Sequence, residues 1–183
     1  MGLEVIKADK RRRGLCDDWE KWLKSADKLY NRFVEREGVS PFRFHEVASV
    51  GFLASASAVA GFLPLAEYEI IKRAAHDRRL KVDGRADLWF DCGDRCYSFE
   101  FKRAYVAATK KNLRDELSYA FSDVARIDRE EYHYAAGALI ARVTESARMP
   151  TYYEFAEHSD VDYAYHIGPD GVHGAFLFFK LVQ

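Results

Sequence analysis

Two short segments in which polar and apolar side chains alternate constrain the fold of this chain most strongly. The segments are Arg85-Ala86-Asp87-Leu88-Trp89-Phe90 and Tyr97-Ser98-Phe99-Glu100-Phe101-Lys102. The stretch between them, residues 91–95, contains Asp and Gly, which supply the backbone conformations of tight turns. The pattern predicts a β-hairpin, and we expect a sheet built around it.

The same alternation predicts which side chains share a face. Successive side chains of a strand point to opposite faces, so Glu100 and Lys102 lie together, and Asp87 joins them if the two apolar faces form one core. Two carboxylates and an ammonium group beside an apolar layer are costly unless a cation or a substrate uses them. This trio is therefore the candidate site. The opposite face carries only apolar side chains: Leu88, Phe90, Tyr97, Phe99 and Phe101.

Composition indicates one ordinary soluble domain. The chain has 183 residues, 49% of them hydrophobic and 31% charged, which suffices for one substantial core. A net charge of −1 argues against a globally basic nucleic-acid-binding surface, so such contacts must come from local patches. The three cysteines have no metal-binding spacing; Cys92 and Cys96 flank the turn and can approach each other, but free thiols are expected.

Nothing in the sequence predicts a membrane or export segment. The N-terminus leads into charged residues, and the apolar stretch 47–63 consists mostly of residues too small for a membrane span. We therefore expect a cytoplasmic protein without a membrane partner.

Turn and cap signals divide the chain into successive elements. A basic arm, Lys7 to Arg13, is expected to be mobile. Asp17 and Asp18 predict the start of a first helix, and Gly38 predicts its end. Ser40 and Pro41 predict the start of a second helix, which carries Glu46 beside its apolar stripe. The expected helices are 16–37, 42–62, 108–128 and a short piece near 151–158, and the expected strands besides the hairpin are 65–73, 134–143, 162–167 and 172–182.

This order predicts a single α/β domain over residues 1–183. Residues 1–40 form the basic arm and N-terminal helix, residues 41–143 form the core, and residues 144–183 form a β-rich C-terminal extension that ends in a hairpin.

The core resembles the PD-(D/E)XK nuclease superfamily, whose restriction endonuclease-like fold has the order helix–strand–strand–strand–helix–strand. The likeness covers roughly residues 43–143, with Asp87 on the second strand and Glu100-Phe101-Lys102 on the third. Asp87 matches the family aspartate, Glu100 the second acid and Lys102 the lysine, while Glu46 matches the acid that many members carry on the first helix. Ala86 stands where a proline often precedes the aspartate.

The resemblance implies a mixed central sheet flanked by helices and a Mg²⁺- or Mn²⁺-dependent nuclease that hydrolyses DNA. Such enzymes are typical of bacterial or phage-derived defence, mobile elements and repair. Asp87, Glu100 and Glu46 are then the expected metal ligands, because Mg²⁺ prefers carboxylate oxygens and keeps several waters. Lys102 is expected to orient the attacking water or to stabilise negative charge, and it is no base unless its pKa falls.

Cations near these strands are candidates for contacts with DNA phosphates, which dominate nucleic-acid affinity. A solvated charge run explains the same residues, and Glu67 and Glu69 on the preceding strand are either extra ligands or part of a solvated edge. The candidate cations are Arg73, Arg78, Arg79, Lys81 and Arg85 before the Asp87 strand, and Lys110, Lys111 and Arg114 at the start of the next helix.

Several other interpretations remain open from the sequence. Glu100 and Lys102 can form a structural salt bridge on an exposed sheet face. The chain can be a catalytically inactive module on the nuclease scaffold that binds nucleic acid or a protein. It can also be an α+β enzyme of another class, in which case Glu46 lies far from the Glu100–Lys102 pair. The N-terminal helix and the C-terminal hairpin are the candidate surfaces for a homodimer or a partner protein.

Overall fold

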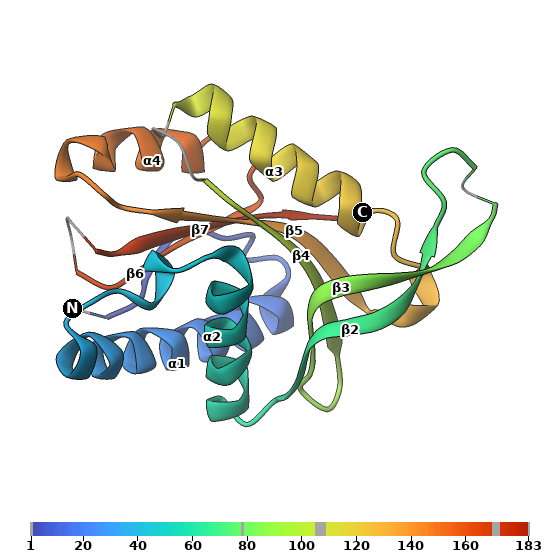
Figure 1. The fold of residues 1–183 in the computed structure, drawn as a ribbon, viewed down its shortest axis with the longest axis horizontal. Helices are drawn as coiled ribbons and strands as arrows, with labels where there is room; N and C mark the ends of the chain where they lie inside the picture. The colour runs from blue at the N-terminus through green and yellow to red at the C-terminus, as the bar shows by residue number, and fades with distance from the viewer. Residues whose placement is uncertain (1, 78, 105–108, 170–172, 183) are drawn as a thin grey trace.

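A seven-stranded mixed sheet forms the centre of the molecule (Figure 1). The computed structural model describes residues 2–77, 79–104, 109–169 and 173–182. Within these residues the strand order is β1-β6-β7-β5-β4-β3-β2, and β4 and β5 form the parallel pair. The α/β class predicted from the sequence is confirmed. The strands are β1 (Glu4–Lys7), β2 (Leu63–Arg73), β3 (Lys81–Asp91), β4 (Cys96–Arg103), β5 (Tyr134–Arg142), β6 (Tyr163–Ile167) and β7 (Ala175–Leu181).

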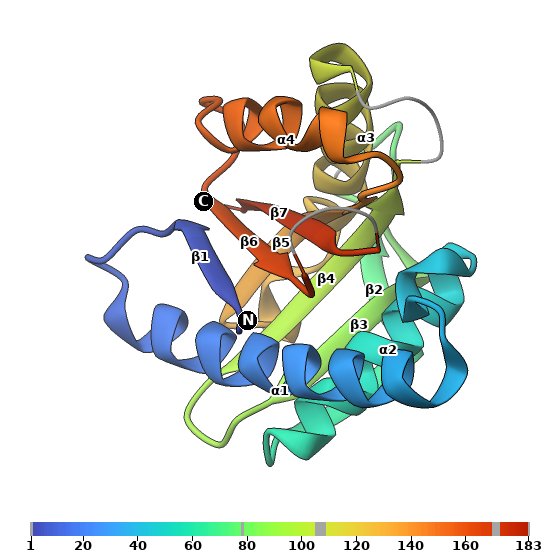
Figure 2. The same ribbon diagram turned by 90° about the vertical axis from the view of Figure 1, so that its left-hand side faces the viewer.

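Helices cover both faces of this sheet (Figure 2). The two N-terminal helices, α1 (Arg13–Glu37) and α2 (Glu46–Val59), lie on one face, and α3 (Lys110–Val124) and α4 (Met149–Ala156) lie on the other. Short 3₁₀ helices, η1 (Pro41–Arg43), η2 (Arg129–Glu131) and η3 (Ser146–Arg148), occur in the connections. The order α2-β2-β3-β4-α3-β5 is thus present over the segment that suggested a nuclease-like core. No helix in the described part of the chain is long and apolar enough to cross a membrane.

The predicted apolar face of the β3–β4 hairpin lies in the main core. Its five side chains are fully buried in one cluster with Trp19 and Trp22 of α1, whose rings contact Phe90, Tyr97 and Phe99. Trp22 donates its indole N–H to the carbonyl of Leu53 at 2.8 Å, which joins α1 to α2. Because Leu88, Phe90, Tyr97, Phe99 and Phe101 share this core, the predicted alternation of faces is confirmed.

The other face of the sheet lies close beneath α3. Gly137 of β5 permits this approach, since a Cβ at this position would lie 2.4 Å from the backbone nitrogen of Phe121. Leu113 and Leu117 of α3 are fully buried against Leu139 of β5 and its neighbours. The helix α3 therefore sits at a fixed height over the strands β4 and β5.

Several element boundaries differ from the sequence-based predictions. The helix α1 begins at Arg13, and its first turn contains no acid, so Asp17 and Asp18 do not mark its start. Gly38 ends α1 as predicted, with a left-handed φ of 69°. Ser40 caps η1, whereas the Nδ1 atom of His45 caps α2 by accepting a hydrogen bond from the Ala48 N–H at 3.3 Å.

The N-terminal arm and the C-terminal hairpin are more integrated than predicted. Residues Glu4–Lys7 form β1, antiparallel to β6, so the arm from Lys7 to Arg13 that was expected to be mobile follows directly from a paired strand. The hairpin β6–β7 lies between β1 and β5, which makes it part of the sheet. Its aromatic side chains, like Trp19 and Trp22 of α1, are buried in the core. A partner surface on these elements stays a prediction, and it would use their remaining exposed residues.

Candidate active site

Strand β3 leaves strand β4 at Asp87. The β3–β4 ladder ends at the pair Leu88–Phe99, and the next donor on β4, the Phe101 N–H, is bound by Oδ2 of Asp87 at 2.6 Å. Leu88 belongs to the main core, whereas Ala86 packs with Val124 of α3 in a separate cluster. The apolar side chains of β3 therefore pack in different clusters before and after Asp87. Together, β2 and β3 extend as a two-stranded ribbon past the end of their pairing with β4 (Figure 1).

Glu46 reaches the same edge of β4 from α2. It is the first residue of that helix, and its carboxylate accepts the N–H of Arg103, two residues beyond Phe101. Residues two apart on a strand are roughly 7 Å apart. Asp87 and Glu46 thus bind successive outward N–H groups on the part of β4 that β3 has left.

Glu100 directly precedes Phe101 on β4 and is only 4% exposed. Its Oε1 atom is 2.5 Å from the Nζ atom of Lys72 on β2. Gly84 of β3 allows this contact, because a Cβ there would lie 2.8 Å from Cδ of Lys72. The ribbon formed by β2 and β3 therefore covers Glu100, and the ion pair between Lys72 and Glu100 is buried.

Lys102 pairs with α3 and not with Glu100. Its Nζ atom lies 3.3 Å from Oδ2 of Asp123, and its side chain is 29% exposed. The expectation of an exposed salt bridge between Glu100 and Lys102 is therefore wrong, since twist of the β2–β3 ribbon brings Lys72 over Glu100 instead. Lys102 also lies close enough to Glu46 to lower the pKa of that carboxyl, although burial has the larger, opposite effect. This proximity contradicts the alternative in which Glu46 lies far from the pair.

Burial and crowding of like charges shift the pKa values of these groups. Burial raises the pKa of Glu100 to about 7, and the neighbouring charge of Asp87 acts in the same direction. Lys72 has the opposite effect and lowers this pKa. Burial also raises the pKa of Asp87, opposed by the Phe101 N–H and by Lys102. Burial alone would lower the pKa of Lys102, but Glu46, Asp123 and Asp87 outweigh it, so this pKa is raised. Four acids and two ammonium groups thus influence one another in this region.

The donor set suits a hard divalent cation, although the side chains do not form a ready ligand cluster. No three His, Cys, Asp or Glu side chains among the described residues are arranged to hold a metal ion. One oxygen of Asp87 and one of Glu100 already have partners. Mg²⁺ in nucleotide and nucleic-acid enzymes is commonly held by one or two carboxylates with several waters. Asp87 and Glu100, with Glu46 beside them, fit that requirement in residue type and position.

Two residues that the sequence-based site did not include, and Glu67, which was a possible extra ligand, complete this region. Lys72 and Asp123 pair with Glu100 and Lys102 through contacts that no local pattern signals. Glu67 lies between the pairs Ala66–Leu88 and Tyr68–Ala86 of the β2–β3 ladder and has a left-handed φ of 52°. Its charge raises the pKa of Asp87, although burial, Phe101 and Lys102 have larger effects. A non-glycine residue with positive φ is uncommon and is a local signal of functional constraint.

Most cations predicted to contact DNA already have acidic neighbours. Their exposed positions remain compatible with phosphate contacts, which stay a prediction, and Arg78 lies outside the described residues. Arg73 and Lys81 pair with Asp128, Arg85 with Glu67, Lys110 with Glu154 and Lys111 with Asp115. The backbone N–H of Arg79 donates a hydrogen bond to the side chain of Asp77. Arg114 lies near Asp160 and helps to lower the pKa of that carboxyl, although Lys180 lowers it more.

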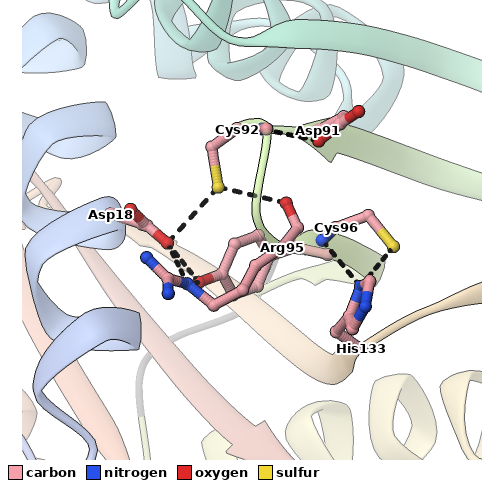
Figure 3. Close-up of polar contacts among 8 residues, drawn as sticks. Asp18, Asp91, Cys92, Arg95, Cys96 and His133 are labelled. Atoms are coloured by element: carbon pink, nitrogen blue, oxygen red, sulfur yellow. Dashed lines mark hydrogen bonds and ion pairs between the residues drawn. The ribbon is translucent and has the colours of Figure 1, made fainter.

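The turn of the β3–β4 hairpin holds a separate cluster of polar contacts (Figure 3). Oδ2 of Asp18 accepts hydrogen bonds from the Arg95 Nε–H at 2.7 Å, the Tyr97 hydroxyl at 2.5 Å and the Cys92 thiol at 3.3 Å. The cysteines are free, as expected, and Cys96 lies beside His133. Nδ1 of His133 accepts a hydrogen bond from the Cys96 backbone N–H at 3.1 Å. Because the backbone already uses this ring nitrogen, the contact is explained without a catalytic thiol–imidazole pair.

Comparisons with known proteins do not identify a family: no protein-family model, no curated protein and no solved structure matches this chain. The functional assignment therefore depends on the geometry described above.

Proposed function

We propose that this chain is a divalent-metal-dependent nuclease that hydrolyses DNA phosphodiester bonds. The observation that carries the proposal is the meeting of Asp87, Glu100, Glu46 and Lys102 where β3 leaves β4. The likeness to PD-(D/E)XK nucleases in motif and element order supports the same assignment, and it suggests a role in bacterial or phage-derived defence, mobile elements or repair.

Each residue has a distinct role in this proposal. Asp87 and Glu100 hold Mg²⁺ or Mn²⁺, with Glu46 as a further ligand directly or through water. The bound cation lowers the pKa of a water molecule and neutralises charge on the phosphate. Lys102 stays protonated because the surrounding acids raise its pKa, so it acts as a donor to the attacking water or to a phosphate oxygen. Water attacks phosphorus and gives up one proton to solvent, the P–O bond to the leaving oxygen breaks, and that oxygen takes up a proton from solvent, so the products are a phosphate monoester and a hydroxyl group.

Plasmid and oligonucleotide cleavage with Mg²⁺ or Mn²⁺ tests the proposal. Asp87→Asn and Lys102→Met should each lower the cleavage rate by about 100-fold or more, as loss of a transition-state contact does. Glu69→Gln is the matched control, because Glu69 is exposed on β2 beside the same ribbon and should leave the rate unchanged. A wild-type chain that cuts neither single- nor double-stranded DNA, or activity that survives both substitutions, contradicts the proposal.

A catalytically inactive module that binds nucleic acid or a protein is the second candidate. It is favoured by the Lys72–Glu100 contact and by the backbone N–H groups bound to Asp87 and Glu46, which give these acids structural roles. Calorimetric titration with Mn²⁺ separates the two candidates. The nuclease requires Mn²⁺ binding that Asp87→Asn weakens, whereas the inactive module requires no Mn²⁺ binding and no effect of the substitution.

A further inference from the structure

Three arginines meet where the parallel strands β4 and β5 end, next to the candidate active site. Arg103 ends β4, Arg142 ends β5 and Arg43 ends η1. The guanidinium group of Arg103 donates hydrogen bonds to the carbonyls of Phe42 at 3.0 Å, Arg43 at 3.2 Å and Phe44. These bonds hold η1, which ends at Arg43, against the end of β4, and η1 also contacts β5, which ends at Arg142.

Arg142 carries a buried donor without an acceptor. Its Nε atom is buried and has no hydrogen-bond partner among the described residues. Burial lowers the pKa of Arg142, and the nearby charges of Arg103 and then Arg43 lower it further. Like charges held together in this way destabilise one another. A bound anion would remove that repulsion and provide the missing acceptor.

The other cations of this region differ in having acidic partners. Within the described residues, neither Arg43 nor Arg142 forms an ion pair with an acid, whereas Lys110 lies 2.5 Å from Glu154 and Arg148 lies 3.2 Å from Glu145. Arg43 and Arg142, which the sequence did not single out, therefore lack the acidic partners that Lys110 and Arg148 have. Arginine is also the side chain best suited to bind a phosphate through two parallel N–H groups.

The arginine cluster adjoins the proposed catalytic residues. Arg103 follows Lys102 directly, and its backbone N–H binds Glu46. We propose that Arg43 and Arg142 bind a backbone phosphate of the nucleic-acid substrate next to the phosphate that is cut. This inference rests on the proposed function for its substrate, but phosphate binding at these arginines requires neither the metal nor catalysis.

Binding of a fluorescent single-stranded DNA oligonucleotide to the full chain in EDTA tests the site, because no cleavage occurs. Arg142→Gln should weaken binding about tenfold and lower the slope of log affinity against log salt by about 0.7, the value for one phosphate contact on a single strand. Arg43→Ala should act in the same direction. Arg148→Ala is the matched control, since Arg148 is a nearby arginine that pairs with Glu145 and should bind within about twofold of wild type.

A second variant separates charge from folding. Arg142→Lys keeps the charge but not the parallel N–H groups, so it should restore the wild-type salt slope while recovering only part of the affinity lost in Arg142→Gln. Wild-type affinity and salt slope in both Arg142→Gln and Arg43→Ala overturn the proposal, as does equal weakening in Arg148→Ala. A salt slope in Arg142→Lys that stays at the Arg142→Gln value, with an unchanged thermal transition, also overturns it. If an acidic peptide of equal charge displaces the oligonucleotide as well as unlabelled DNA does, the assignment to a nucleic acid is overturned.

The outcome for the nuclease proposal is distinguishable. If the chain never cuts DNA but its DNA binding depends on Arg142, the proposal of a phosphate site is supported and the proposal of a nuclease is contradicted. A chain whose cleavage depends on Asp87, but whose DNA binding ignores Arg43 and Arg142, retains the nuclease and overturns the phosphate site.

Discussion

The buried carboxyl of Glu100 makes the stability of the fold depend on pH. Its pKa rises from an ordinary 4.5 to about 7, first through burial and then through the charge of Asp87. The native state thus favours the protonated form, and the resulting stabilisation is fully present below about pH 4.5 and is lost as the pH rises through about 7. At 1.36 kcal/mol per pH unit, this change is worth about 3 kcal/mol. Burial also raises the pKa values of Asp87 and Glu46, which adds to the same trend.

Urea unfolding in EDTA between about pH 5 and about pH 8 measures this dependence. The wild-type free energy of unfolding should fall by about 3 kcal/mol or more across the range. Glu100→Gln should fall by distinctly less, because an amide does not titrate. Glu69→Gln is the control, since Glu69 is exposed on β2, and it should keep the wild-type slope. The same slope in Glu100→Gln as in wild type would refute the reasoning, whatever the absolute stability of the variant.

The same experiment with Mn²⁺ tests the link to metal binding. A cation that binds ionised Glu100 should restore stability above pH 7, by about 2.7 kcal/mol at 100 times its dissociation constant. Glu100→Gln and Asp87→Asn should each weaken this restoration. Equal stabilisation of the wild type and both variants by Mn²⁺ would place the ion elsewhere on the chain.

Two further predictions concern packing around the site. Gly137→Ala should destabilise the fold by about 3 kcal/mol or more in thermal or urea unfolding, because the added Cβ would lie 2.4 Å from the Phe121 backbone. Gly51→Ala is the control: a Cβ there meets nothing within 4 Å, so this change should be neutral or stabilising by up to about 1 kcal/mol. Asp18→Ala should cost about 1–3 kcal/mol, because Arg95 and the buried Tyr97 hydroxyl lose their acceptor, whereas Asp17→Ala should cost much less, and equal losses in both would contradict this assignment.

The faces of the β3–β4 hairpin could be predicted from the sequence because strand alternation leaves few solutions. Five apolar side chains on one face require a common core, and this requirement fixes Asp87, Glu100 and Lys102 on the other side. Gly38 could be predicted as a helix end for an equally local reason, its left-handed conformation. These features depend on neighbours within a few residues or on one directly paired strand.

The contacts within the site depend on residues far apart in the chain and could not be predicted in the same way. Lys72 reaches Glu100 only because β2 and β3 twist over β4 and because Gly84 leaves room for its side chain. Arg142 meets Arg103 only because β5 runs parallel to β4. The strand β1 has four residues and no clear alternation, so only its pairing with β6 defines it. Local patterns hold no information on these arrangements.

The departure of β3 from β4 carries the strongest physical argument for a function at this site. A sheet that served stability alone would continue the ladder past Leu88 and Phe99, and the N–H groups of Phe101 and Arg103 would be satisfied by β3. Here Asp87 and Glu46 bind them instead, which explains these two acids as caps of an open strand edge. Glu100 caps no strand edge: it is nearly inaccessible and paired with Lys72, its pKa is raised to about 7, and its charge must compete with that of Asp87. An apolar residue at this position would avoid that cost. The retention of a third acid, where two others already meet, is expected if the acids share a cation during catalysis.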